Sequence, residues 1–400
     1  MSNTLEGWLR ARRCLRLQIA GLALSSLPLA GCTLEDDVLE ELRGALAPRG
    51  HGAHSGGCEQ DCLGAACLNG QCEPLTLAQG PFRSLVSAEH ELYAVEETAV
   101  DGGTNFEVVR LALDGSRVER IAGGQSAAGL GKIAVDESYL YGSIWLRPGH
   151  SQLWRIPLSG GGFSAEEGGL LLGEVAVGLA AVAKLEVSQD YLVALTTRPT
   201  ERTLTRTLAR FDKRGGAAGV FTTIDPEGGA GLVLAELDAD VIQGFAETGG
   251  ASIVRVPLAG GGPVLVATAE PGEDLRDIAR SGDELVVAAR SSGPPAPTTG
   301  RIARVPAAGG TIVTLGSGDP YRLIADSEFV YYFSAVADRC LEGGSDLYRL
   351  PLDGSSAPVL LANEATPGCI ETMVSDADAV YWLTNDLNSD VERIRKVSKH

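Results

Sequence analysis

The chain has 400 residues, of which 44% are hydrophobic and only 5% aromatic, with 51 glycines and a formal net charge of -19. This is a globular composition rich in turns. The acidic balance argues against a nucleic-acid partner, because phosphate recognition needs clustered Lys and Arg. It also argues against broad electrostatic attraction to anionic lipid.

The N-terminal segment predicts export. A basic region over residues 10–16 precedes an apolar stretch over residues 17–29, which is too short for a stable membrane span. The sequence Leu29-Ala30-Gly31-Cys32 resembles the lipobox of bacterial lipoproteins. The resemblance implies a signal peptide over residues 1–31 and lipidation of Cys32. An ordinary signal peptide with a chance cysteine is the alternative, and the pair Arg12-Arg13 leaves Sec or twin-arginine export open.

A lipidated Cys32 would place the chain in the bacterial cell envelope, with the membrane as a partner through the N-terminal lipid. Thr33, rather than an aspartate, follows the cysteine. In enterobacterial sorting this favours the outer membrane. We therefore expect an outer-membrane protein that faces the periplasm or the surface.

Residues 32–57 lack periodicity and predict a flexible tether. A cysteine-rich segment over residues 58–72 follows, with Cys58, Cys62, Cys67 and Cys72. In an exported chain disulfides are expected, with three pairings open. Zinc is the competing interpretation, and the lack of a C-x-x-C pair weakens it. We predict no metal site. The segment resembles the short cysteine-rich segments of myxobacterial lipoproteins.

A repeat dominates the remaining chain. Similar motifs such as "LWRIPLSGGG" from Leu153 and "IVRVPLAGGG" from Ile253 each contain a basic residue. These anchors are Arg110, Arg155, Arg210, Arg255, Arg304, Arg349 and Lys396. Their successive spacings of 45, 55, 45, 49, 45 and 47 residues match one four-stranded propeller blade. The sequence therefore predicts an all-β, seven-bladed β-propeller over residues 73–400, each unit running strand A, turn, B, loop, C, Gly-rich turn, D.

The seventh unit ends after its third strand. The missing D strand resembles the segment "EPLTLAQG" over residues 73–80, which precedes the first unit. We predict that this segment completes the last blade, because an open ring would leave an exposed strand edge.

The motif "VYWLTND" followed by "RIRKV", together with "LYRLPLDGSS", resembles the YWTD-type and TolB-like β-propellers. The resemblance covers Glu73 to His400. YWTD propellers have six blades, whereas seven units are counted here.

Cys340 and Cys369 should lie on one rim in adjacent blades, so we predict a disulfide between them. The seven anchors are expected to neutralise buried carboxylates or cap turns. The aspartates that recur near the A-to-B turns are expected to bond backbone amides. They are Asp136, Asp190, Asp283, Asp326 and Asp376.

No catalytic residue or cofactor is predicted, because no histidine is expected on a channel-lining A strand beside a nucleophile. The B-to-C loops, such as Arg198–Thr207, Ser291–Gly300 and Val336–Asp346, vary between units. Variable loops on a rigid repeat are typical of binding surfaces. These loops are also longer than the turns expected on the opposite rim. We therefore expect a non-enzymatic binding or assembly scaffold at the cell envelope that binds an envelope protein or polymer through the long loops on this one rim. A lyase or hydrolase using channel carboxylates and a purely structural envelope protein are the alternatives.

Overall fold

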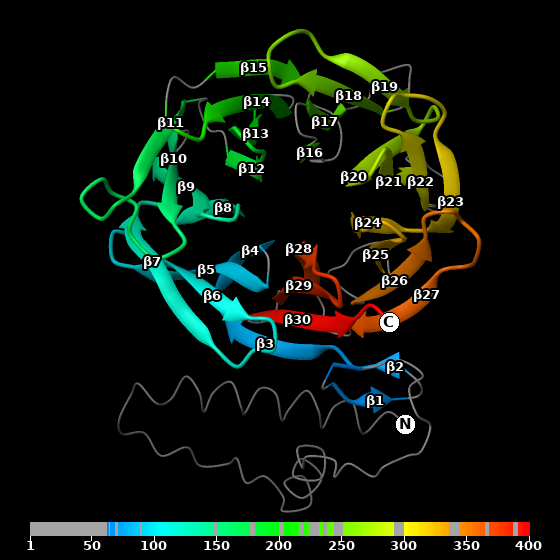
Figure 1. Cartoon of the computed structure of the whole chain (residues 1–400), viewed down its shortest axis with the longest axis horizontal. Coiled ribbons are helices and arrows are strands. Elements are labelled where there is room, and N and C mark those ends of the chain that lie inside the picture. Colours follow the sequence, from blue (N-terminus) through cyan, green and yellow to red (C-terminus); the bar gives the residue numbers. More distant parts are fainter. Residues whose placement is uncertain are drawn as a thin grey trace, which may run out of the picture. The chain divides into compact units, whose positions relative to one another are not determined.

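In the part of the chain that the structure describes, seven four-stranded antiparallel sheets form a ring around a channel (Figure 1). This computed structural model confirms the all-β, seven-bladed propeller. It describes residues 62–63, 65–68, 71–88, 90–147, 150–176, 181–199, 204–215, 219–224, 232–234, 238–243, 251–291, 300–335, 344–364, 368–386 and 391–400. Among them no helix is long and apolar enough to cross a membrane. The predicted signal peptide, Cys32 and the tether lie outside these residues.

Each blade runs outward from strand A at the channel to strand D at the perimeter. Blades 1 to 3 contain β4 (Phe82–Ala88), β5 (Glu91–Val100), β6 (Gly103–Ala112) and β7 (Val118–Ser126); β8 (Leu130–Val135), β9 (Tyr139–Arg147), β10 (His150–Pro157) and β11 (Leu170–Ala176); and β12 (Ala181–Val187), β13 (Tyr191–Pro199), β14 (Leu204–Asp212) and β15 (Gly219–Ile224).

Blades 4 to 7 complete the ring. They contain β16 (Leu232–Leu234), β17 (Asp238–Gln243), β18 (Ser252–Pro257) and β19 (Val264–Thr268); β20 (Glu273–Ser281), β21 (Glu284–Ser291), β22 (Gly300–Pro306) and β23 (Val313–Gly318); β24 (Pro320–Ala325), β25 (Phe329–Ala335), β26 (Ser345–Pro351) and β27 (Val359–Glu364); and β28 (Gly368–Ser375), β29 (Ala379–Asp386), β30 (Glu392–Ser398) and β3 (Leu75–Gly80).

The last blade joins the two ends of the propeller sequence. Strand β3 pairs antiparallel with β30, in a register that places Leu75 opposite Lys396 and Gly80 opposite Glu392. Figure 1 shows the two strands side by side, β3 in blue and β30 in red. The predicted closure by the N-terminal strand is therefore confirmed, and β30 is not left as an unpaired edge strand.

The core is distributed around the ring. Seven clusters of buried apolar residues in the described chain each span the faces of two adjacent blades. B strands are covered on both faces, so β21 carries the near-continuous apolar run "LVVAA", whereas β10 alternates. Trp382 is fully buried between blades 6 and 7, packing edge-to-face on Phe333 at 5.4 Å between centroids.

The Gly-rich part of the repeat forms the C-to-D turn. In six blades the glycine five residues after the anchor has a positive φ, for example Gly160 at 110° and Gly260 at 109°. Its amide donates to the carbonyl oxygen three residues earlier, as Gly160 does to Pro157. Only glycine adopts this conformation without strain, which explains why the motif recurs.

Two short strands, β1 (Cys67–Leu68) and β2 (Gln71–Cys72), precede the ring. A disulfide joins Cys62 to Cys72, and Cys67 is also disulfide-bonded. Cys72 is buried and belongs to the apolar cluster between blades 6 and 7. The cysteine-rich segment therefore packs on the propeller at its perimeter. Cys58 lies outside the described residues.

Candidate functional site

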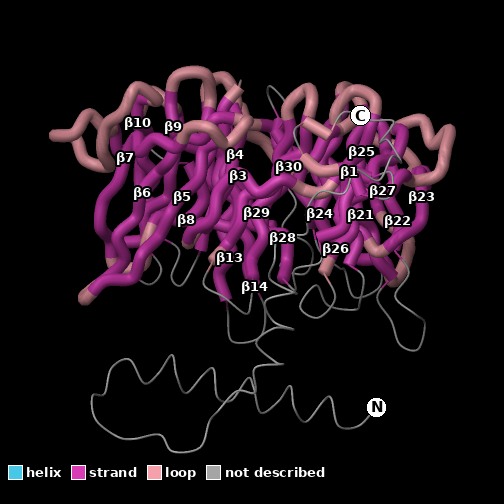
Figure 2. The backbone as a smooth tube through the Cα atoms, turned by 90° about the horizontal axis from the view of Figure 1, so that it is seen from below, coloured by secondary structure: helices cyan, strands magenta, loops and turns pink. Residues whose placement is uncertain are grey.

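The ring has two rims with different connections. The B-to-C rim carries the B-to-C and D-to-A connections, and the A-to-B rim carries the A-to-B and C-to-D turns; Figure 2 shows the ring edge-on. A-to-B turns are uniformly short, as between Ser281 and Glu284. The B-to-C connections vary from residues 101–102 in blade 1 to residues 336–344 in blade 6.

Two findings correct the loop expectation. The C-to-D connection of blade 2, residues 158–169, is longer than any B-to-C connection, so long loops are not confined to one rim. Arg198 pairs with Thr205 and Pro199 pairs with Leu204, so strands fill most of the predicted loop at 198–207. Residues 292–299 and 336–343, in the other two predicted loops, lie outside the described residues.

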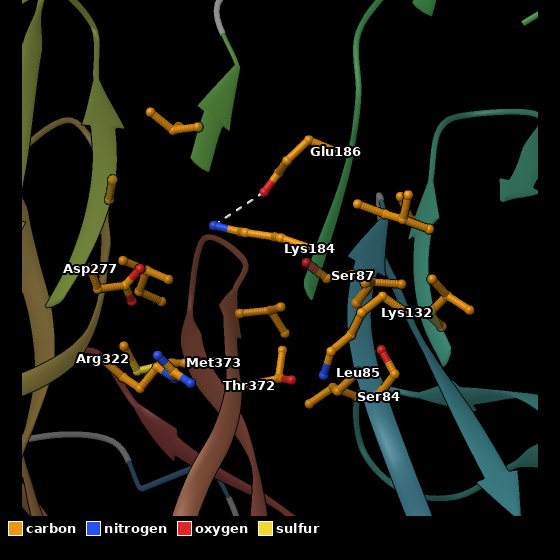
Figure 3. A pocket seen from close by; sticks show the side chains of 18 of the residues that line it. Ser84, Leu85, Ser87, Lys132, Lys184, Glu186, Asp277, Arg322, Thr372 and Met373 are labelled. Atoms are coloured by element: carbon orange, nitrogen blue, oxygen red, sulfur yellow. Dashed lines mark ion pairs between the residues drawn. The ribbon is translucent and has the colours of Figure 1, made fainter. Parts of the chain in front are cut away.

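The central channel forms a cavity of about 450 Å³, lined by residues from all seven A strands. Pockets for small molecules in proteins commonly have volumes in this range. Figure 3 shows the side chains that line it. This cavity is the candidate functional site.

A β-bulge shapes the lining of the channel. In β28 the register shifts between Ile370 and Thr372, so Glu371 is an extra residue, and Glu371 and Thr372 both line the cavity. Register shifts at the corresponding place in β4, β8, β12, β20 and β24 repeat this feature. At β28 two consecutive polar residues, Glu371 and Thr372, therefore belong to the lining.

Four polar residues on consecutive inner strands form an arc at one level of the channel. Going around the ring they are Arg322 on β24, Thr372 on β28, Ser84 on β4 and Lys132 on β8. In Figure 3 the ends of Lys132 and Arg322 point toward the same end of the cavity, with Thr372 between them. Two cations therefore flank two hydroxyl groups.

Two other charged side chains on this lining, Lys184 and Asp277, are engaged by the protein. Lys184 Nζ donates to the carbonyl oxygen of Leu232 at 2.6 Å and lies 3.3 Å from Glu186. Asp277 accepts from the amide of Leu323 at 3.1 Å. By contrast, neither the Lys132 amine nor the Arg322 guanidinium makes a hydrogen bond or ion pair with any described residue.

The electrostatics of Lys132 reflect this position. Burial lowers the pKa of its amine, the nearby Arg322 lowers it further, and Glu371 opposes both effects; the pKa lies below its ordinary value. A cation removed from water without a close partner is costly. A bound anion would relieve that cost.

Ionic contacts brace the B-to-C rim at the seam of the ring. Arg83 of blade 1 pairs with Glu392 of blade 7 and lies 3.9 Å from Glu97. Burial raises the pKa of both carboxyl groups. The positive charge of Arg83 lowers both pKa values, and the hydrogen bond from the Leu130 amide lowers that of Glu97, but burial has the larger effect. These contacts hold the strand ends of blades 7, 1 and 2 together.

The seven predicted anchors all lie on C strands, and five of them make one of two kinds of contact. Arg155, Arg210, Arg349 and Lys396 each donate to a backbone carbonyl of the next blade, on the residue three beyond that blade's own anchor. Arg255 instead forms a two-pronged pair with Asp240, which is fully buried, through two contacts of 2.8 Å.

The two remaining anchors differ from these. Arg110 contacts the carboxylates of Glu91 and Glu119 at 3.4 and 2.8 Å, both within blade 1. Arg304 makes no hydrogen bond or ion pair among the described residues. The anchors thus lie away from the channel, and most of them connect strands or blades.

A second set of blade-to-blade contacts had not been anticipated from the sequence. Lys213 of blade 3 binds Asp136 of blade 2 at 2.5 Å, and Lys399 of blade 7 binds Asp326 of blade 6 at 2.9 Å. Both lysines lie three residues beyond an anchor. That shared offset is the sequence signal that could have identified them.

The repeated aspartates only partly follow the prediction. Asp136, Asp326 and Asp376 each accept hydrogen bonds from two backbone amides of their own A-to-B turn. Asp190 instead contacts Arg214 at 3.0 Å. Asp283 contributes its backbone carbonyl, which accepts from the amide of Ala307.

The predicted disulfide between Cys340 and Cys369 stays a prediction. Cys369 lies at the start of β28, at the B-to-C rim. Cys340 lies outside the described residues. Among the described residues, no group of three His, Cys, Asp or Glu side chains lies close enough to hold a metal ion.

No protein-family model matches the chain, and no curated protein matches its sequence. Solved structures do resemble it. An oligogalacturonate lyase in complex with manganese has a TM-score of 0.60 at 13% identity, covering 85% of this chain and 96% of that one. The β-propeller domain of the trilobed protease from Pyrococcus furiosus has a TM-score of 0.53 at 10% identity, covering 80% and 95%.

The acylaminoacyl peptidase of Pyrococcus horikoshii has a TM-score of 0.53 at 10% identity over 76% of this chain. The match covers 49% of the peptidase, so this chain spans about half of its length. At such identities the likeness shows the β-propeller fold alone. The protease propeller is described as having an open velcro topology, whereas β3 closes the ring here.

Proposed function

We propose that the chain is a lipid-anchored, non-enzymatic β-propeller that binds an envelope protein or polymer at its B-to-C rim. The supporting observation is that ion pairs join adjacent blades at the B-to-C rim, where the B-to-C connections differ in length. At the seam, Arg83 pairs with Glu392, and Arg395 lies 3.8 Å from Glu364 of the preceding blade. Rigid scaffolds that carry variable loops are the usual basis of binding surfaces.

Proximity crosslinking with mass spectrometry, in the protein's own cells, tests this proposal. One variant carries Gly-Ser replacements of residues 200–203 and 292–299 on the B-to-C rim. A matched control replaces Ala165–Gly168, four exposed residues on the opposite rim. We expect the wild type and the control to capture the same partner and the loop variant to lose it. Retention of the partner by the loop variant, or no partner for the wild type, would overturn the proposal.

The lipid anchor is tested separately through Cys32→Ala. We expect the wild type to fractionate with membranes and to incorporate a fatty-acid label, and the variant to lose both properties. Membrane fractionation by an unlabelled wild type would show that the anchor is not a lipid on Cys32.

A second candidate function is a lyase or hydrolase of envelope polymers. Three carboxylates favour it. Glu371 lines the cavity and acts electrostatically on Glu392 at the B-to-C rim, and burial raises the pKa of both Glu392 and Glu97. Raised carboxyl pKa values are common at catalytic sites. If the chain is a lyase or hydrolase, Glu371→Gln should abolish its cleavage of envelope polymers. If the wild type cleaves no envelope polymer, this candidate fails.

The third alternative is a purely structural envelope protein without a ligand. It predicts a propeller whose surfaces and channel offer no pocket. The channel cavity of about 450 Å³ counts against it.

A further inference from the structure

The arc of Arg322, Thr372, Ser84 and Lys132 combines groups that recognise an anionic oxygen. The two cations belong to blades 6 and 2, and the hydroxyls belong to blades 7 and 1. None of the four side chains makes a hydrogen bond with a described residue. Hydrogen bonds between charged donors and a carboxylate are among the strongest in proteins.

The charges at this end of the channel favour a monoanion. Lys132 and Arg322 are cationic, and Glu371 beside them is the acidic group that interacts electrostatically with Lys132. The formal charges of these three groups sum to +1; the Asp277 carboxylate, which also lines the cavity, accepts the Leu323 amide. A bound carboxylate would balance the +1 charge, whereas a dianionic phosphate would leave an excess negative charge in a partly buried site.

The next level of the channel is apolar. Residues two positions further along each inner strand point to the same face, and most of them are small or branched apolar residues. They are Val86, Ala134, Val233, Ala279, Ile324 and Val374, and all line the cavity. Glu186, at this level on β12, is paired with Lys184. An organic body could therefore lie against this ring.

We propose that the channel binds a small organic acid, with its carboxylate held by Arg322, Thr372, Ser84 and Lys132 and its apolar body against the ring of Ile324, Val374, Val86 and Ala134. This site is independent of the partner proposed for the B-to-C rim. Its ligand class is a monocarboxylate of a size that fits a cavity of about 450 Å³.

Calorimetry on the full-length chain tests the proposal with benzoate as the probe. Benzamide has the same size and ring but no charge, so comparison of the two isolates the role of the carboxylate without any mutation. We expect benzoate to bind at least tenfold more tightly than benzamide. Equal affinities, or no detectable binding of benzoate, would overturn the proposal.

Variants locate the site. Lys132→Met and Arg322→Met remove a cation and keep an unbranched apolar side chain, and each should weaken benzoate binding at least tenfold. Lys184→Met is the matched control, since Lys184 lies at the same level but donates to Leu232. We expect it to change the affinity by less than twofold. Unchanged binding in the double variant of Lys132 and Arg322 would place benzoate elsewhere and overturn the assignment.

Two further measurements distinguish specific carboxylate binding at this site from nonspecific binding of any anion. Inorganic phosphate should bind more weakly than benzoate; tighter binding of phosphate would overturn the choice of a carboxylate. At alkaline pH, benzoate binding should take up protons in the wild type and not in Lys132→Met, because a bound anion raises the pKa of Lys132. A merely structural role of Lys132 would not produce this difference.

Discussion

Lys396, in the last C strand of the ring, donates a hydrogen bond from Nζ to the backbone carbonyl oxygen of Leu113 in blade 1, at 3.1 Å. The bond crosses the seam where the two ends of the propeller sequence meet. Arg155, Arg210 and Arg349 make the corresponding bond at three other boundaries. The boundary between blades 7 and 1 is thus bridged by the same kind of hydrogen bond, from a basic C-strand side chain to a backbone carbonyl of the next blade, as these three internal boundaries.

Replacement of Lys396 by Met should destabilise the ring. The side chain is 7% exposed, and its loss leaves the Leu113 carbonyl without this donor. We expect the free energy of unfolding to fall by about 1 to 3 kcal/mol, measured by urea denaturation. Arg214→Met is the control, because the Arg214 side chain is 79% exposed; its effect should stay within about 0.5 kcal/mol. Equal effects of the two variants would contradict a role for the seam bond.

Deletion of residues 74–79 should destabilise the whole propeller rather than blade 7 alone. These residues include most of β3, which completes the last sheet, and each blade packs on both neighbours. Hydrogen exchange is the measurement, and we expect protection to fall in all seven blades. Loss of protection confined to β28, β29 and β30 would show that the blades are energetically independent.

The contact between Lys399 and Asp326 should make stability depend on acid pH. Burial alone would raise the pKa of Asp326, but hydrogen bonds from Lys399 and from two backbone amides together lower it. A lowered carboxyl pKa contributes stability above the unfolded value, about 3.9, that is lost as pH falls through the folded value. Asp326→Asn should therefore be less stable than the wild type near neutral pH, and the difference should shrink on acidification.

Glu392 should change stability with pH in the opposite direction to Asp326. Burial raises its pKa despite the pairing with Arg83, so its ionisation lowers stability as pH rises from the unfolded value through the folded one. Glu392→Gln should remove that decline. Denaturant titrations from pH 3 to 7 measure both slopes. The same change of slope in both variants would contradict the assignment.

The predicted disulfide between Cys340 and Cys369 can be tested by peptide mapping without reduction. We expect a linked peptide containing both residues, since Cys369 is the second residue of strand β28, at the B-to-C rim, and export favours oxidation. Alkylation of Cys369 in the unreduced protein would show that its thiol is free.

The sequence was sufficient for the blade count because one basic residue and one glycine recur at fixed offsets. The glycine five residues after each arginine anchor recurs because the turn requires a positive φ. Closure was predictable because Lys396 has no D strand after it. These features are local, or they repeat along the chain.

The candidate site was not predictable in the same way. Arg322, Thr372, Ser84 and Lys132 each come from a different blade, and nothing in their local sequence marks them as neighbours. The bulge at Glu371 also breaks the period-two pattern that assigns residues to a face. Identifying the arc therefore required the register of every inner strand.

The closing strand also sets the earliest time at which the ring can close. Pro74 and its partner Arg395 are separated by 321 positions, so β3 is synthesised long before the strand that pairs with it. At ~5 to 20 residues per second this delay is roughly 16 to 64 s. During that interval β3 lacks the strand that it pairs with, and its backbone N–H and C=O groups can pair wrongly with other nascent chains. Closure of the ring therefore cannot begin before the last strand has been synthesised.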